Sequence, residues 1–155
     1  MVDVNDDFRN SCRSGKTYKV KELLDNPDLD PMACDEYMWN GLDYACNNGH
    51  LEIVRLLLLD PRIDPSETEN FALARAIFGE RYNSNGETDN NSFSNRKCID
   101  ERYPEIVRLM LQDGRCSIPT WIAEIDYIRI SEPVKQILDQ YIFRLDGPIY
   151  NQNII

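Results

Sequence analysis

The chain contains a single histidine, His50, and none of the short motifs that mark common catalytic or nucleotide-binding sites. One histidine excludes a metal site with two histidine ligands, and no cysteines are at the CxxC spacing typical of zinc sites. The patterns GxxxxGK[ST], GxGxxG and GxSxG are also missing, which excludes phosphate-cradling loops and a nucleophile elbow. We therefore expect no cofactor, no metal and no enzymatic activity.

Basic residues are scarce as well. The chain has 17 lysines and arginines against 27 aspartates and glutamates, so its formal net charge is −10. A negative surface repels phosphate backbones and anionic lipid headgroups, and we expect neither nucleic acid nor a membrane as a partner. The acidic residues cluster, for example at Asp28–Glu36 and Asp60–Glu69. Such clusters either attract a basic patch on a protein partner or keep exposed loops solvated.

Long hydrophobic runs are absent too. The stretch Leu56–Leu59 is far too short to cross a bilayer, and the first ten residues hold no basic segment followed by an apolar run. We expect no secretory signal there. The five cysteines are odd in number, which fits free thiols in a reducing compartment better than a disulfide framework. These features predict an intracellular, cytoplasmic protein.

What the chain does have is an internal repeat with a period of 34 residues. A shift by that period superimposes nine pairs: Phe8 on Leu42, Cys12 on Cys46, Gly15 on Gly49, Val20 on Val54, Leu23 on Leu57, Leu24 on Leu58, Pro27 on Pro61, Leu29 on Ile63 and Pro31 on Pro65. A repeat of this length is typical of solenoid proteins, in which each unit contacts its neighbours.

Each unit has the pattern of two short helices joined by a tight turn. In the second unit Leu42, Ala45 and Cys46 form one apolar stripe, and Gly49 can take the left-handed conformation that ends a helix. A second stripe follows at Ile53, Val54, Leu57 and Leu58, and Pro61 ends it. Because one helix pair cannot close its own apolar face, neighbouring pairs are expected to stack.

The second unit resembles the ankyrin repeat. Residues 40–58 read NGLDYACNNGHLEIVRLLL, and the family signature is TPLHxAAxxGHLEVVKLLL. The two differ mainly at Asn40–Asp43, where the family has threonine, proline, leucine and histidine. The phrase Asp60–Pro65, echoed at Asn26–Pro31, resembles a variant common in ankyrin proteins of large DNA viruses and protists. The resemblance implies an all-α, ankyrin-type helix-turn-helix solenoid of about three to four repeats, in a viral protein that acts on a host.

The repeat register predicts one domain over residues 1–147 and a tail at 148–155. Its units are expected at about 6–31, 32–65 and 66–119, with a divergent C-terminal cap at 120–145. Leu73 and Val107 are 34 positions apart, whereas Leu42 and Val54 are 12 apart, so the third unit holds an insert of about 22 residues. This insert, at 80–102, is polar and predicts a long loop, which is either a binding element or a tolerated insertion.

The third unit and the cap keep the helical spacing. Phe71, Leu73, Ala76 and Ile77 predict the first helix of unit three, and 105–111 predicts its second. In the cap, 121–128 predicts a first helix, and 133–138, with Pro133 in its first turn, predicts a second.

The residues that could carry chemistry lie at repeat positions. In ankyrin repeats a histidine like His50 supports the turn by hydrogen bonding, and we favour that role over catalysis. Cys12 and Cys46 are equivalent in successive units, so both are expected in the core. The acidic pairs Asp28 with Asp30 and Asp60 with Asp64 lie at junctions, where their carboxylates are expected to accept bonds from backbone N–H groups.

The resemblance also implies a binding surface on the concave side, made of finger loops and exposed positions of the first helices. The candidate protein-binding residues are Asn10, Arg13, Tyr37, Trp39, Tyr44, Asn47, Arg75 and Phe78. Aromatic and arginine side chains of this kind dominate many binding hot spots. The bulky run Tyr37–Trp39 either anchors a partner or packs internally.

We expect a monomeric, non-catalytic interaction module for a cellular or host protein. The alternative is a targeting adaptor, in which the repeats hold a protein while residues 121–141 dock on ubiquitin-ligase or similar machinery.

Overall fold

The computed structural model describes residues 3–78, 101–118 and 130–146, and within them every regular element is a helix. The helices are α1 (Val4–Arg13), α2 (Thr17–Leu24), α3 (Gly41–Asn47), α4 (Leu51–Leu59), α5 (Glu67–Phe78), α6 (Arg102–Asp113) and α8 (Glu132–Asp146). The predicted all-α class is therefore confirmed over the described residues. Within this part of the chain, no helix is both long enough and apolar enough to span a membrane.

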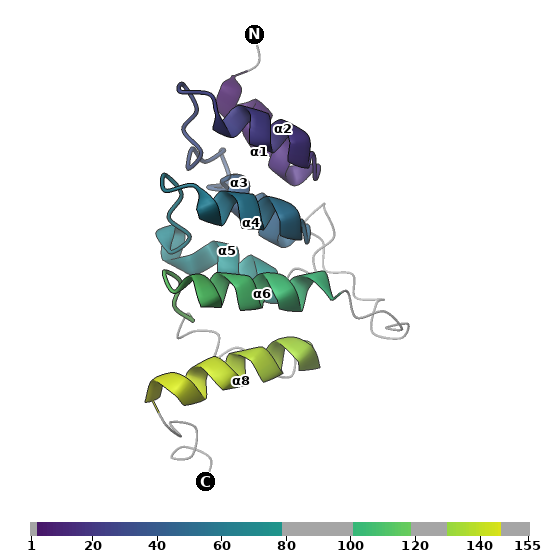
Figure 1. The fold of residues 1–155 in the computed structure, drawn as a ribbon, viewed down its shortest axis with the longest axis vertical. Coiled ribbons are helices and arrows are strands. Elements are labelled where there is room, and N and C mark those ends of the chain that lie inside the picture. Colours follow the sequence, from purple (N-terminus) through teal and green to yellow (C-terminus); the bar gives the residue numbers. More distant parts are fainter. Residues whose placement is uncertain (1–2, 79–100, 119–129, 147–155) are drawn as a thin grey trace.

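The helices pair and stack in two layers (Figure 1). Helices α1, α3 and α5 pack on one another in one layer, and α2, α4, α6 and α8 follow one another in the second. The pairs α1–α2, α3–α4 and α5–α6 thus form successive steps of a solenoid. This arrangement confirms the prediction that the helices of Leu42–Leu58 pack against those of Phe8–Leu24.

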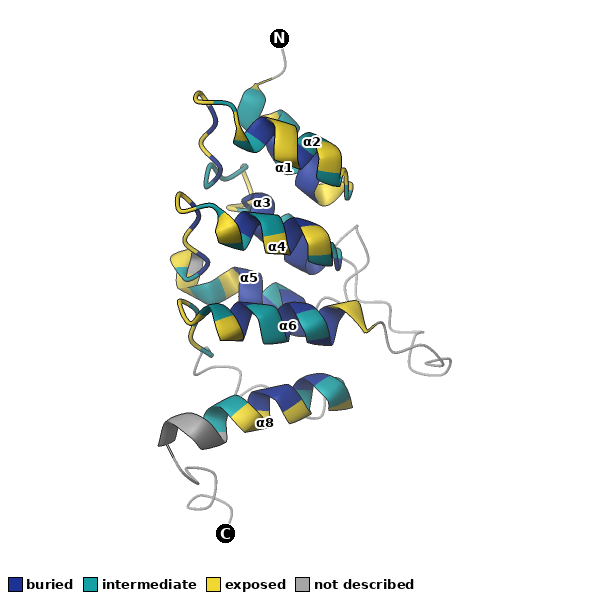
Figure 2. Cartoon of the chain, viewed as in Figure 1, coloured by how far each residue is buried: buried dark blue, intermediate teal, exposed yellow. Residues whose placement is uncertain are grey.

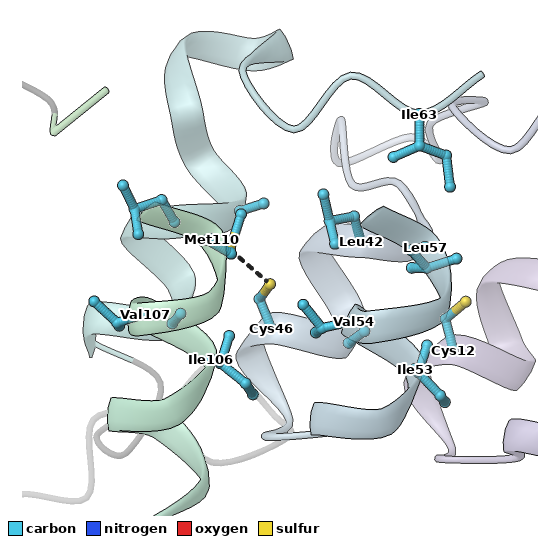
Figure 3. Packing of buried hydrophobic residues seen from close by; sticks show 14 of the residues in the cluster. Cys12, Leu42, Cys46, Ile53, Val54, Leu57, Ile63, Ile106, Val107 and Met110 are labelled. Carbon is cyan, nitrogen blue, oxygen red and sulfur yellow. Dashed lines mark hydrogen bonds between the residues drawn. The ribbon is translucent and has the colours of Figure 1, made fainter. Parts of the chain in front are cut away.

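The core runs without interruption between the two layers (Figure 2). Its fully buried side chains come from every described helix pair and include Phe8, Leu42, Ile53, Leu57, Leu73, Ile106, Met110 and Leu138. Cys12 and Cys46 are buried as predicted, and the Cys46 thiol lies 3.4 Å from the Met110 sulfur (Figure 3). Burial raises the pKa of the Cys12 thiol to about 12, so this cysteine acts as a small apolar core residue.

Helix α3 begins with a capping box at the point where the sequence departs from the ankyrin signature. The Asn40 Oδ1 atom accepts from the Asp43 N–H at 3.0 Å, and the Asp43 Oδ2 atom accepts from the Asn40 N–H at 3.0 Å. Two N–H groups that a helix start leaves unpaired are satisfied in this way. Asn40 and Asp43 thus cap the start of α3 where the ankyrin signature has threonine and histidine.

The turns between paired helices carry the first set of bonds between units. Arg13 O can only accept, so the His50 Nε2 atom, 3.0 Å away, carries a proton and donates to it. This confirms the predicted turn-supporting role of His50. Tyr103 does the same one unit later, because its hydroxyl donates to Asn47 O at 3.0 Å. The two side chains are equivalent: each precedes a buried valine of its second helix by four positions.

A second set of bonds between units comes from two arginines on the loops after α4 and α6. Each guanidinium is held by the aspartate two positions before it and donates to two backbone carbonyls of the preceding unit. For Arg62 the partners are Asp60, Leu24 O and Leu29 O, and for Arg115 they are Asp113, Leu58 O and Ile63 O. Charge-assisted bonds to carbonyls at helix ends satisfy acceptors that lack a partner within their own helix.

Replacing one of these arginines tests how much the units depend on this contact. Arg115→Ala is expected to lower the free energy of unfolding by about 2 kcal/mol, because two carbonyls lose charged donors. Urea unfolding followed by circular dichroism measures the loss. Arg55→Ala is the matched control. Among the described residues Arg55 pairs with the exposed carboxylates of Glu52 and Glu105, so its loss is expected to change stability by about 0.5 kcal/mol or less. Equal losses in the two variants would contradict the assignment.

Three of the four aspartates predicted at the junctions show the expected turn chemistry. Asp28 differs, because it takes part in its turn through its own N–H, which donates to Asn26 Oδ1 at 2.9 Å. The carboxylates of Asp30, Asp60 and Asp64 each accept from the backbone N–H two residues later, at 2.9–3.0 Å. Hydrogen bonds from Arg62 lower the pKa of Asp60, so this carboxylate is ionised at neutral pH.

Several predictions about the C-terminal half differ from the structure or lie beyond it. Phe71 belongs to the apolar pattern that predicts the first helix of unit three, but it is 47% exposed, whereas Ala72, Leu73 and Ala74 directly after it are buried. Helix α6 begins at Arg102, which the predicted insert had included. Residues 79–100, the first cap helix predicted at 121–128 and the tail at 148–155 lie outside the described residues. The second cap helix is present as α8 and packs on α6.

Candidate protein-binding surface

The loop before α3, here called the finger (Asp35–Asn40), is organised by one carboxylate. Asp35 Oδ1 accepts from the backbone N–H groups of Tyr37 at 2.9 Å and Trp39 at 3.0 Å. The Asp35 N–H donates to Trp39 O at 3.0 Å, and the Met38 N–H donates to Asp35 O at 3.0 Å. These four bonds fix the backbone of a short loop, so the side chains at its tip are held in place.

The tip of the finger displays two large apolar side chains. Tyr37 is 71% exposed and Met38 is 68% exposed. Met38 also has a φ of 63°, in the left-handed region that favours glycine. A residue with a Cβ in this conformation costs about 1 kcal/mol or more. The chain therefore carries both backbone strain and exposed apolar area at the same position.

Helix α3 supports the finger through Tyr44, whose hydroxyl donates to Asp35 Oδ2 at 2.5 Å. Burial raises the pKa of Asp35, but hydrogen bonds from Tyr44, Trp39 N–H and Tyr37 N–H, with the charge of Arg9, lower it by more. Burial and the bond to Asp35 raise the pKa of Tyr44 to about 12. At neutral pH, Asp35 is thus a carboxylate and Tyr44 a neutral donor.

A row of two arginines and three aromatic rings crosses the first-helix layer. The Arg13 guanidinium lies 5.5 Å from the centre of the Tyr44 ring, and Tyr44 lies 5.0 Å from Trp39, centre to centre. Arg75 lies over the other end of the row, 3.8 Å from the Trp39 ring centre and 6.0 Å from that of Phe71. Each contact is within the range of cation–π or aromatic pairing. The row joins α1, the finger, α3 and α5 into one surface.

The predicted site residues fall into two groups. The structure brings Arg13, Trp39, Tyr44 and Arg75 together in the row and places Tyr37 at the finger tip. Of the remaining predicted residues, Asn10 is exposed on α1 and Phe78 is half-buried against the core.

The prediction that Asn47 faces solvent is wrong, because only 6% of it is exposed. Helix α3 lies between α1 and α5, and the Tyr103 hydroxyl reaches Asn47 O. The run Tyr37–Trp39, for which two roles were open, is divided between them: Tyr37 and Met38 are exposed, whereas Trp39 is half-buried under Arg75.

Sequence reasoning missed three contributors to this surface. Asp35 was grouped only with the acidic clusters, although an aspartate at the start of a loop is a known acceptor for N–H groups two to four residues later. Phe71 was used only as part of the apolar pattern that predicts the first helix of unit three. The left-handed conformation of Met38 could not be predicted from its residue type, because residues in this conformation are mostly glycine, asparagine or aspartate.

The described residues contain no group of three or more histidine, cysteine or acidic side chains that could hold a metal ion. A shallow, open pocket lies in the other layer and is lined by Leu51, Glu101, Arg102, Pro104, Glu105, Arg108 and Pro133.

Comparison with known proteins gives one match. Residues 39–70 match the family model of the ankyrin repeat, from Trp39 in the finger through α3 and α4 into the start of α5. No curated protein and no solved structure matches the chain. Together with the stacked helix pairs, the match supports an ankyrin repeat protein with an ankyrin-type solenoid fold. Ankyrin repeats are protein–protein interaction modules.

Proposed function

We propose that this chain is a non-catalytic module that binds a cellular or host protein through the finger and the first-helix layer. The observation that carries the proposal is the finger tip, where Met38 combines an exposed side chain with a left-handed backbone. Strained backbone persists where the surrounding structure holds it in place, and such positions cluster at binding sites. The Asp35 hydrogen bonds provide that support here.

The surface favours a partner with an apolar pocket and basic surroundings. Tyr37 and Met38 are the anchors for the pocket, since aromatic and methionine side chains are enriched in interface cores. Exposed carboxylates of Glu36, Glu67 and Glu69 lie on the finger and at the start of α5, and they favour lysine or arginine on the partner. The arginines of the row lie against aromatic rings of the chain itself. The row therefore supports the surface beside Tyr37 and Met38, and its arginines are not counted as contacts to the partner.

The test begins with affinity purification from the native cell or the infected host to obtain the partner. The variant Tyr37→Ala with Met38→Gly is expected to weaken binding by at least about tenfold. Glycine relieves the left-handed strain, so Met38→Gly alone is expected to raise the free energy of unfolding by about 0.5–1 kcal/mol. Calorimetry gives the affinity, and urea unfolding gives the stability. Weaker binding by a double variant that is at least as stable as the wild type cannot be caused by unfolding.

A matched control removes exposed apolar side chains from the other layer. Tyr18 on α2 is 75% exposed and Leu59 on α4 is 81% exposed, so Tyr18→Ala with Leu59→Ala takes away comparable surface. This control is expected to bind as tightly as the wild type. Unchanged binding of the finger variant, or an equal loss in the control, would contradict the proposal.

The adaptor alternative stays a prediction. It depends on residues 121–141, of which 121–129 lie outside the described part of the chain.

A further inference from the structure

Two buried polar atoms on α3 have no hydrogen-bond partner among the described residues. The first is Asp43 Oδ1, on a residue that is 2% exposed, and the second is Asn47 Oδ1, one helical turn later. Residues four apart on a helix lie on the same face. Both atoms are acceptors in this arrangement, so each lacks a donor. Burying such an atom without a partner costs free energy, most of all when it belongs to a carboxylate.

A proton on Asp43 Oδ1 would turn one of these two acceptors into a donor. Asp43 Oδ2 already accepts from the Asn40 N–H, so a proton on Oδ1 leaves the capping box intact. The new O–H group would be a donor on the same helix face as the Asn47 amide oxygen. We propose that Asp43 is a proton switch in the central repeat: it binds a proton at Oδ1 as the pH falls below neutrality, and the protonated form stabilises the solenoid.

The charged and titratable groups around Asp43 come from several elements. On α4, which packs on α3, the charged side chains Glu52 and Arg55 pair with each other at the exposed surface. The thiols of Cys34 and Cys46 also interact electrostatically with Asp43. Arg75 on α5 favours the carboxylate, and Asp35 in the finger disfavours it. Helix α1 presents Arg9, whose guanidinium pairs with Asp6 and donates to Ala33 O. Burial is the largest influence and raises the pKa of Asp43 to about 6, although the Asn40 N–H and Arg75 lower it.

The sign of the pH effect follows from the direction of this shift. The pKa of Asp43 is higher in the folded chain than its ordinary value of 3.8, so the proton stabilises the folded state. That stabilisation is complete below pH 3.8 and is lost as the pH rises through about 6. The pKa values of Asp35, Asp60, Asp64 and Asp113 are lowered instead, so their contributions are lost only at more acidic pH.

The test compares urea unfolding of the wild type and Asp43→Asn at pH 5.0 and pH 7.5. An asparagine side chain keeps the oxygen that accepts from Asn40 and adds a permanent N–H donor toward Asn47. The quantity compared is the unfolding equilibrium constant of the wild type divided by that of the variant. From pH 5.0 to pH 7.5 this ratio is expected to rise about tenfold, because the wild type loses the stabilising proton. The single histidine and the other carboxylates are common to both proteins, so their titration cancels.

Asp28→Asn is the control, because Asp28 is exposed and the ratio is expected to stay constant with pH. Parallel pH profiles for the wild type and Asp43→Asn would overturn the proposal. Carboxyl NMR of the wild type gives a second measurement if the variant fails to fold: a midpoint for Asp43 near pH 6 supports the switch, and one below about pH 4.5 overturns it. Neither readout requires a bound partner, so both stand apart from the test of the proposed function.

Discussion

Gly41→Ala is expected to destabilise the fold by about 2–3 kcal/mol, although alanine is ordinarily better than glycine in a helix by about 1 kcal/mol. A Cβ atom at Gly41 would lie 2.7 Å from Phe8 Cε1 and 3.1 Å from Cys12 Sγ. Both neighbours are fully buried, so neither can move without disturbing the core. Gly41 is the first residue of α3, and its missing side chain sets how closely α1 and α3 approach.

A double-mutant cycle identifies the cause of this loss. Phe8→Leu removes the ring atom that the new methyl group would strike, so Gly41→Ala is expected to cost at least about 1 kcal/mol less in that background. Gly114→Ala is the contrasting control. Gly114 has a φ of 81°, and an added Cβ atom there would meet no atom of the described residues within 4 Å, so backbone strain of about 1 kcal/mol is expected. A Gly41→Ala variant that is as stable as the wild type in urea would show that the contact relaxes freely.

The sequence predicts the helix pairs well because their signals are local. The apolar spacing at Ile53, Val54 and Leu57 and the turn glycines Gly15 and Gly49 act within a few residues, and the structure places all of them as expected. The repeat strengthens the prediction, because two units with the same pattern are expected to have the same structure.

The facing of individual side chains is harder to predict because it depends on the neighbouring unit. Arg13 and Asn47 hold the same repeat position, yet Arg13 is exposed in the first unit and Asn47 is buried in the second. The difference arises from the three-dimensional packing of α3 between α1 and α5. The unpaired oxygen of Asp43 likewise depends on which groups surround it. Neither property is encoded in the residue type or its spacing.

The arginine contacts between units could be predicted in part: less well than the helix pairs, but better than the facing of single side chains. An aspartate two positions before an arginine occurs after α4 and again after α6, whereas the matching positions of the first unit are Asn26 and Asp28. The recurrence was visible in the sequence, but the carbonyl partners were not, because they lie 33 to 57 positions earlier.

Tyr103→Ala is expected to lower the free energy of unfolding by about 3–4 kcal/mol, because it removes a buried ring that packs against Gly49. Tyr103→Phe keeps the ring and removes the hydroxyl that donates to Asn47 O, so it is expected to cost about 1–2 kcal/mol. Tyr103→His places at this turn the residue that the preceding unit uses at His50, and an imidazole donor there is expected to recover part of the loss of Tyr103→Ala. Urea unfolding of the three variants ranks them. A phenylalanine variant as stable as the wild type would show that the Asn47 carbonyl finds another donor, and that the turn depends on the ring alone.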